Sequence, residues 1–206
     1  YAPMIYYPLS VLLRAGILEI LIISSPDQLP AFRSLLGDGS GLGVSISYTA
    51  QDAPRGIAES LIIAEEFLLG DSCTLILGDN LFYGDGVEKG LQKAINSGGA
   101  SIFSYPVKDP ERYGVIEFDT TGEPQDIIEK PAIAPSNRAV TGLYVYPNSA
   151  VDVAKGLKPS TRGEIEITDV NKHYLKTGDL QGVALSKSDS WFDTGTIDSL
   201  YEATDY

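Results

Sequence analysis

One stretch of the sequence decides the class of fold: Cys73-Thr74-Leu75-Ile76-Leu77-Gly78-Asp79-Asn80. Its first five residues form a mostly apolar run, which is typical of a strand buried on both faces of a parallel sheet. A glycine and an acid follow directly, and in open α/β sheets ligands bind just beyond the carboxyl ends of the strands. Asp79 is therefore a candidate ligand-binding carboxylate, although an acid that only caps a turn would fit the same pattern.

Helical and apolar segments alternate on both sides of this stretch. Apolar residues recur at helical spacing in some segments, and short runs rich in Ile, Leu and Val lie between them. Helices are expected at 4–15, 30–36, 56–69 and 87–96, and strands at 19–24, 44–48, 73–77 and 100–106. This alternation predicts an α/β fold with a Rossmann-like, mostly parallel sheet flanked by helices.

After Pro106 the pattern changes to short strands separated by Gly and Pro, which indicates a small β-rich insertion. The expected strands are 115–118, 126–129 and 140–146, followed by helices at 149–155 and 165–176, a strand at 182–185 and a helix from Thr196. Because no Gly/Ser-rich linker marks a boundary, we expect residues 1–206 to form a single domain.

The composition excludes several classes of function. The 28 acids and 15 bases give a formal net charge of -13, which disfavours a nucleic acid or an anionic membrane as partner. No run approaches the roughly 20 apolar residues of a membrane span. Cys73 is the only cysteine, so no intramolecular disulfide is possible, and a reducing cytoplasm fits. His173 is the lone histidine and is expected to be a surface or structural residue, since zinc sites usually need several such ligands.

A second acid of the same kind lies in Trp191-Phe192-Asp193-Thr194-Gly195-Thr196, where it could instead cap the helix that follows. Two acids at strand ends could together hold Mg²⁺, which takes one or two carboxylates plus phosphate oxygens of a substrate. Asp79 and Asp193 are therefore the candidate metal ligands, although their spacing in sequence does not show that they meet.

Three further segments carry candidate binding residues. The loop 51–59 leads from a strand into a helix, so the Gln51 amide and the main chain shaped by Pro54 and Gly56 could bind a planar base; a tight connection would look similar. Glu129 and Lys130 could bind sugar hydroxyls and a phosphate, or form a surface ion pair. Arg162 precedes a helix start, where it could reach an anion or only decorate the first turn.

The order of the motifs resembles one family, the glucose-1-phosphate thymidylyltransferases of bacteria and archaea among the sugar-phosphate nucleotidyltransferases. The resemblance spans essentially all 206 residues and rests on these segments: Pro3-Met4-Ile5-Tyr6-Tyr7-Pro8-Leu9-Ser10, Leu36-Gly37-Asp38-Gly39-Ser40, Pro54-Arg55-Gly56-Ile57-Ala58-Glu59, Leu77-Gly78-Asp79-Asn80, Phe82-Tyr83-Gly84, Asp109-Pro110-Glu111-Arg112-Tyr113-Gly114-Val115, Glu129-Lys130-Pro131, Val140-Thr141-Gly142-Leu143-Tyr144, Arg162-Gly163-Glu164-Ile165-Glu166-Ile167-Thr168-Asp169 and Asp193-Thr194-Gly195-Thr196.

The resemblance implies a nucleotide-diphospho-sugar transferase fold and a Mg²⁺-dependent reaction of dTTP with glucose 1-phosphate that yields dTDP-glucose and pyrophosphate. Residues 1–105 would bind the nucleotide and residues 106–206 the sugar phosphate. Asp79 and Asp193 match the magnesium pair, and Gln51 and Gly56 the base-recognising loop. The sugar and its phosphate are matched by Tyr113, Gly114, Glu129, Lys130, Val140, Tyr144 and Arg162, of which Lys130 and Arg162 would contact the phosphate and contribute to catalysis. A homo-oligomer in the cytoplasm is also implied.

The sequence departs from the family pattern at both ends. The Gly-rich loop that grips the triphosphate in the family would precede Tyr1, and a helical region would follow Tyr206, so we expect residues 1–206 alone to be inactive. Two alternatives stay open: a nucleotidyltransferase that uses UTP or another nucleotide, and a non-catalytic subunit that binds sugar nucleotides.

Overall fold

The computed structural model describes residues 2–195, which form two compact units. Unit 1 contains residues 2–15, 72–147 and 171–195, and unit 2 contains residues 16–71 and 148–170. Each unit joins segments that are far apart in the sequence, so the units do not follow the halves 1–105 and 106–206. The single domain and the assignment of those halves to nucleotide and sugar phosphate stay predictions.

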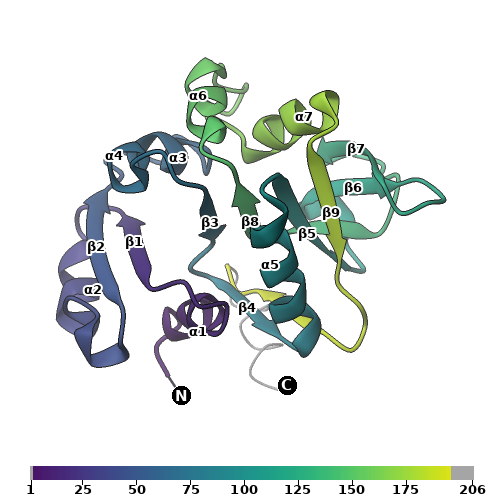
Figure 1. Cartoon of the computed structure of the whole chain (residues 1–206). Coiled ribbons are helices and arrows are strands. Elements are labelled where there is room, and N and C mark those ends of the chain that lie inside the picture. Colours follow the sequence, from purple (N-terminus) through teal and green to yellow (C-terminus); the bar gives the residue numbers. More distant parts are fainter. Residues whose placement is uncertain (1, 196–206) are drawn as a thin grey trace. The chain divides into compact units, whose positions relative to one another are not determined.

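Unit 2 is built around two parallel strands that pair from Glu19 opposite Ser45 to Ser24 opposite Ala50. A helix connects them, as parallel neighbours require, and it packs beside the second strand (Figure 1). The elements of this unit are β1 (Glu19–Ser24), α2 (Leu29–Leu36), η1 (Ser40–Leu42), β2 (Ser45–Ala50), α3 (Glu59–Ile63), α4 (Glu65–Leu68) and α6 (Ser149–Gly156).

The helix expected at 56–69 is two short helices, and it starts three residues later than predicted. The delay has a cause in the backbone: the N–H of Ile165 donates to the carbonyl of Arg55 at 2.7 Å, and the N–H of Ala58 donates to the carbonyl of Ile165 at 3.2 Å. Gly56 lies between them at a φ of 102°, a value that favours glycine. Residues 55–58 therefore form a fixed loop instead of a first helical turn.

Unit 1 contains most of the strands. Its elements are α1 (Tyr6–Arg14), β3 (Cys73–Ile76), β4 (Asn80–Tyr83), α5 (Asp85–Ser97), β5 (Ala100–Pro106), η2 (Pro110–Arg112), β6 (Gly114–Phe118), β7 (Pro124–Glu129), β8 (Arg138–Tyr146), residues 171–177 of α7 (Ile167–Thr177), β9 (Leu180–Ala184) and β10 (Ser190–Asp193). The expected helix from Thr196 lies outside the described residues.

Strand β8 is the centre of the main sheet of unit 1. It runs antiparallel to β3, β5 and β6, while β7 continues the sheet beyond β6 and β9 lies parallel to β5. Among the strand pairs of residues 2–195, only β1 with β2 and β5 with β9 are parallel, so the expectation of a mostly parallel sheet is corrected to a mixed one. The connection between β6 and β7 is a short turn, because antiparallel neighbours need no helical crossover.

The core of unit 1 lies between α5 and the main sheet (Figure 1). Leu91 of α5 and Phe103 of β5 are both 0% exposed, and burial of side chains of this size contributes about 1.5–3 kcal/mol each. The helix approaches closely at Gly90, where an added Cβ would lie 2.9 Å from Cγ1 of Val183 and 3.1 Å from Cε1 of Phe103. This packing holds the strands that carry the candidate site.

Two short strands, β4 and β10, form a separate antiparallel ribbon that the sequence did not predict. Asp189 fastens it to α5. Its carboxylate is 4% exposed and accepts hydrogen bonds from the N–H of Gly86 at 2.9 Å and from the N–H and hydroxyl of Ser186 at 3.0 and 2.8 Å. A side chain on Gly84 or Gly86 would collide with this carboxylate. Asp189 thus caps the first turn of α5 and fixes where β10 begins.

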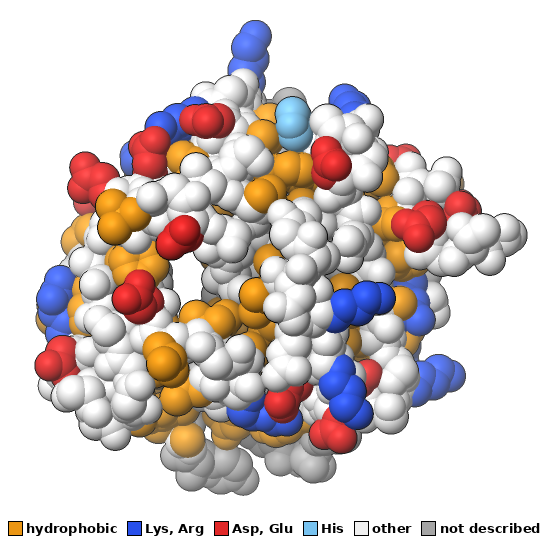
Figure 2. Space-filling model, in the orientation of Figure 1, with side chains coloured by type: hydrophobic (Ala, Val, Ile, Leu, Met, Phe, Trp, Pro, Cys, Tyr) orange, Lys and Arg blue, Asp and Glu red, His pale blue; other side chains and the backbone are white. Residues whose placement is uncertain are grey.

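The surface agrees with the expectations from composition. Acidic and basic side chains lie interspersed on the face shown in Figure 2, where the lone histidine lies at the surface. His173 is exposed and packs edge-to-face with Tyr174 at a ring distance of 5.4 Å. Burial raises the pKa of the Cys73 thiol to about 11, so this thiol stays protonated. None of the helices in the described part has the length and apolar character needed to cross a membrane.

We predict that Asp189→Ala lowers the free energy of unfolding by about 1–3 kcal/mol, because the partly buried hydrogen bonds from Gly86 and Ser186 lose their acceptor. Urea unfolding followed by circular dichroism would measure this. Lys187→Ala, an exposed neighbour, should leave the unfolding midpoint unchanged. Equal stability of the two variants would contradict the capping role.

Candidate active site

The two candidate metal ligands lie side by side in unit 1. Strands β4 and β10 pair so that Asp193 stands opposite Asn80, the residue after Asp79. Thr194 ties the ends of the ribbon together, since its N–H and its hydroxyl donate to the carbonyl oxygen of Asp79 at 2.9 and 2.7 Å. The pairing of β4 with β10 joins positions 80 and 193, which are 113 residues apart, and so brings Asp79 and Asp193 close together. The spacing in sequence could not show this.

The carboxylates converge on a small space beside Gly195. A Cβ placed on this glycine would lie 3.2 Å from Oδ1 of Asp193 and 3.3 Å from Oδ2 of Asp79. The backbone N–H of Gly195 also donates to Oδ1 of Asp193 at 3.1 Å. One oxygen from each acid therefore borders the same point, next to a residue that has no side chain.

The electrostatic surroundings of Asp193 include both acids and bases. Burial raises the pKa of its carboxyl group, and the neighbouring Asp79 carboxylate raises this pKa further. The hydrogen bond from Gly195 and the positive charges of Arg112 and Lys130 act in the opposite direction. The half-buried Asp193 therefore lies within electrostatic reach of a second carboxylate and two cations, a mixture suited to binding both a cation and an anion.

Asn80 orients the first acid, a role that the sequence did not reveal. Its side chain is 2% exposed, and its Nδ2 donates to Oδ1 of Asp79 at 2.9 Å. Its Oδ1 accepts from the N–H of Gly142 at 3.0 Å and from Nε1 of Trp191 at 2.6 Å. A Cβ on Gly142 would lie 2.7 Å from this oxygen, so the backbone can donate only because position 142 has no side chain. Asn80, Gly142 and Trp191 occur in the quoted motifs, but only their contacts give them roles.

Lys130 has an unusual backbone. Its φ is 42°, in the left-handed region, although the residue is not glycine and a proline follows it. Its N–H donates to the carbonyl of Tyr113 at 3.0 Å, at the end of the β6 and β7 pairing in which Gly114 stands opposite Glu129. Strained residues of this kind cluster at binding sites, where the surrounding structure fixes them.

The other candidate sugar-binding residues lie in unit 1, on β6, β7 and β8 or directly before β6. Tyr113 packs edge-to-face on Trp191 at a ring distance of 5.3 Å, with the guanidinium of Arg112 over its ring at 5.5 Å. Tyr144 is 4% exposed; burial raises the pKa of its hydroxyl and the nearby Glu129 carboxylate raises it further. Val140, on the same strand, is 9% exposed.

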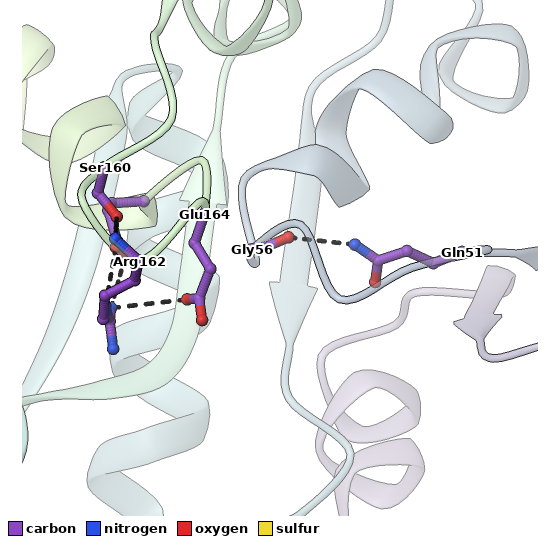
Figure 3. A network of polar contacts seen from close by, with 6 residues as sticks. Gln51, Gly56, Ser160, Arg162 and Glu164 are labelled. Atoms are coloured by element: carbon purple, nitrogen blue, oxygen red, sulfur yellow. Dashed lines mark hydrogen bonds and ion pairs between the residues drawn. The ribbon is translucent and has the colours of Figure 1, made fainter.

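The remaining candidates, Gln51, Pro54, Gly56 and Arg162, lie in unit 2. Figure 3 shows the side-chain nitrogen of Gln51 donating to the carbonyl of Gly56. It also shows Arg162 beside Ser160 and Glu164, and Arg162 pairs with Glu166 through Nε at 3.2 Å and Nη2 at 2.7 Å.

The convergent acids, the neighbouring cations and the mixed α/β architecture define a class of protein. The chain matches the family described as nucleotidyl transferase over residues 1–206, and it belongs to that family. This confirms the membership that the order of the motifs implied, and with it the predicted α/β class.

Individual proteins of this family share about half of their aligned residues with this chain. The chain is 51% identical over 205 residues to a glucose-1-phosphate thymidylyltransferase of Neisseria meningitidis serogroup A, covering 99% of this chain and 71% of that protein. A protein of the same name from Xanthomonas campestris pv. campestris is 52% identical, with 99% and 70% covered. A Bacillus anthracis structure described as this type of protein, in complex with a sucrose, superposes with a TM-score of 0.91 at 39% identity, covering 98% and 81% of the two chains.

We predict that Asn80→Ala destabilises the protein by about 2–4 kcal/mol, because two buried donors, the N–H of Gly142 and Nε1 of Trp191, lose their acceptor. The fluorescence of Trp191, the only tryptophan, should shift in the native state and report the unfolding transition. Asn96→Ala, at an exposed position of α5, is the matched control. An unchanged midpoint for Asn80→Ala would show that Asn80 does not support the ribbon.

We further predict that Asp193→Asn raises the melting temperature of the metal-free protein at neutral pH. The raised pKa means that the folded state disfavours the ionised carboxyl, so ionisation weakens folding as the pH rises above 3.8, the ordinary value. The gain should be full at pH 7 and shrink as the pH approaches 4. A melting-temperature difference that is independent of pH would contradict this, and Asp152→Asn, at an exposed position of α6, should show no difference.

Proposed function

We propose that this chain transfers a thymidylyl group from dTTP to glucose 1-phosphate, giving dTDP-glucose and pyrophosphate. The Neisseria and Xanthomonas proteins that share about half of its residues are named for this activity. The observation that carries the proposal is the convergence of the Asp79 and Asp193 carboxylates beside Gly195, near two cationic side chains. Such a pair suits a reaction between two phosphate-bearing substrates.

In the proposed reaction an oxygen of the glucose 1-phosphate phosphate group attacks the α-phosphorus of dTTP. A P–O bond forms to that phosphorus while the bond to the oxygen that bridges to the β-phosphorus breaks. Pyrophosphate leaves with this electron pair. Because the attacking group is already an anion, no side chain needs to act as nucleophile or to accept a proton. Catalysis then consists of aligning two anions and offsetting the charge that develops on the transferred group.

Asp79 and Asp193 would hold a Mg²⁺ ion between them. The space beside Gly195 fits this ion, since one oxygen from each acid borders it and position 195 itself has no side chain. When bound, Mg²⁺ supplies positive charge opposite the phosphate oxygens on which charge develops. Within residues 2–195 no group of three or more His, Cys, Asp or Glu side chains has a metal-binding arrangement, but Mg²⁺ completed by substrate phosphates requires only one or two carboxylates.

The two other proposed catalytic cations differ in their surroundings. Lys130 lies within electrostatic reach of Asp193 and would bind the sugar phosphate beside the metal. Arg162 forms a two-bonded pair with Glu166 in unit 2, so it would bind a phosphate by exchanging part of this pair for the anion. Both proposed roles rest on the ability of ammonium and guanidinium groups to bind phosphate.

The sugar and the base would use different residues. The sugar would bind among residues of β6, β7 and β8 and the segment before them, with the Glu129 carboxylate accepting from hydroxyl groups: Tyr113, Gly114, Glu129, Val140 and Tyr144. The base would bind at the loop of unit 2 formed by Gln51, Pro54 and Gly56. Thymine differs from uracil by one methyl group, worth roughly 1 kcal/mol, so UTP is the natural competitor.

The experiment is a product analysis of the full-length protein with glucose 1-phosphate, MgCl₂ and an equimolar mixture of dTTP, UTP, ATP and GTP. We expect dTDP-glucose as the main sugar nucleotide and UDP-glucose as the second. A different main product would reassign the nucleotide. Binding of dTDP-glucose without any turnover would instead support a non-catalytic binding subunit.

We predict that Asp79→Asn and Asp193→Asn each lower kcat/KM by at least 10²-fold, because either change removes half of the charge that holds Mg²⁺. Isothermal titration with dTTP should show that both variants also lose the Mg²⁺-dependent part of the affinity. Asp152→Asn should retain activity. A variant that loses kcat/KM but keeps Mg²⁺-dependent dTTP binding would move the metal to other ligands.

A further inference from the structure

Glu59 is a nearly buried acid whose two oxygens serve different partners. It is the first residue of α3 and is 8% exposed. Its Oε1 accepts from Nε of Arg55 at 2.6 Å, and its Oε2 accepts from Nε2 of Gln51 at 2.7 Å. Glu59 forms an ion pair with Arg55, and a carboxylate can only accept hydrogen bonds. The mechanism above gives Glu59 no role.

The contacts of Gln51 fix which way its amide points. Its Nε2 carries two hydrogens, and it has two acceptors, Oε2 of Glu59 and the carbonyl of Gly56 at 3.2 Å (Figure 3). Turning the amide over would place its oxygen against two other oxygens and forfeit both hydrogen bonds. Both N–H donors of the Gln51 amide are therefore used in hydrogen bonds within the protein. The oxygen is the polar atom of this amide that can face a ligand.

The loop that carries these groups is held rigidly. Ile165 donates to the carbonyl of Arg55 and accepts from the N–H of Ala58, which fixes the backbone on both sides of Gly56. A side chain at Gly56 would collide with the backbone of Ile165. A fixed amide on a fixed loop presents either a donor or an acceptor to the ligand, and it cannot change between them. A ligand that offers no matching hydrogen-bonding group binds weakly, because a polar group is left unpaired.

We propose that Glu59 is a positioning residue that determines base specificity: it holds the Gln51 amide so that its oxygen accepts a hydrogen bond from the base. This inference rests on the proposed function, in which Gln51 faces the base. The N3–H of thymine or uracil can donate to this oxygen, whereas N3 of cytosine is itself an acceptor and would be repelled. Glu59 would thus select the class of oxo-pyrimidine nucleotides without touching the nucleotide.

The variant Glu59→Gln tests this directly. Arg55 can only donate, so it keeps the oxygen of the new amide, and the nitrogen of that amide then faces Gln51. Gln51 would turn over to accept from it and present its own nitrogen to the base. We expect the ratio of Kd values for dCTP and dTTP, measured by isothermal titration with Mg²⁺, to fall at least tenfold from its value in the unchanged protein.

A second variant supplies the rescue. In Arg55→Ala combined with Glu59→Gln, the new amide oxygen is released from Arg55 and can again accept from Gln51, so part of the preference for dTTP should return. Glu65→Gln is the matched control, because it removes an exposed acid of the same unit that pairs with Lys155. The melting temperatures of all variants separate loss of specificity from loss of folding, since unfolding would weaken the binding of dTTP and dCTP alike.

The outcomes distinguish the two proposals. If the unchanged protein binds no nucleoside triphosphate, the proposed function fails. If it prefers dTTP over dCTP and Glu59→Gln keeps that preference in full, the proposed function stands and the role of Glu59 is overturned. A lowered preference without any recovery in the double variant would also overturn it, because the effect would then not pass through the amide of Gln51.

Discussion

The pairing of β4 with β10 is the constraint on which the candidate site depends. It brings Asp193 opposite Asn80 and thereby beside Asp79, and Thr194 closes the end of the ribbon with two hydrogen bonds to the same carbonyl. A shift of this register by one residue would turn Asp193 to the other face of the ribbon. The buried carboxylate of Asp189 prevents such a shift, since it ties the start of β10 to the first turn of α5.

Glycines at three positions allow the close contacts on which the candidate binding residues depend. Gly142 lets a backbone N–H reach the buried oxygen of Asn80, and Gly195 leaves the space that the two carboxylates share. In unit 2, Gly56 allows the loop to pass close to Ile165. Gly56 and Gly142 permit close contacts that an added side chain would block, and a side chain at Gly195 would crowd the two carboxylates.

The charges of the protein are arranged in a way that its net charge of -13 conceals. Arg112 and Lys130 lie within electrostatic reach of Asp193, so the acids that would bind a cation are next to bases that would bind a phosphate. In unit 2 the Arg162 guanidinium is paired with Glu166, and Arg55 is paired with Glu59. Opposite charges are thus kept close together within each unit.

The sequence by itself determined the α/β class, nearly all of the helices and strands, and, through the order of its motifs, the family. These features depend on local periodicity and on short segments, which are read along the chain. It also named Asp79, Asp193, Gln51 and Gly56, because each lies at a strand end or in a connecting loop.

Only the tertiary structure decided the rest. The mixed directions of the sheet, the ribbon of β4 and β10, and the convergence of Asp79 with Asp193 arise from pairings between distant segments, which no local pattern encodes. The contacts of Asn80, Asp189 and Glu59 became visible for the same reason. Each is an ordinary polar residue in sequence, and only folding brings its hydrogen-bond partners to it.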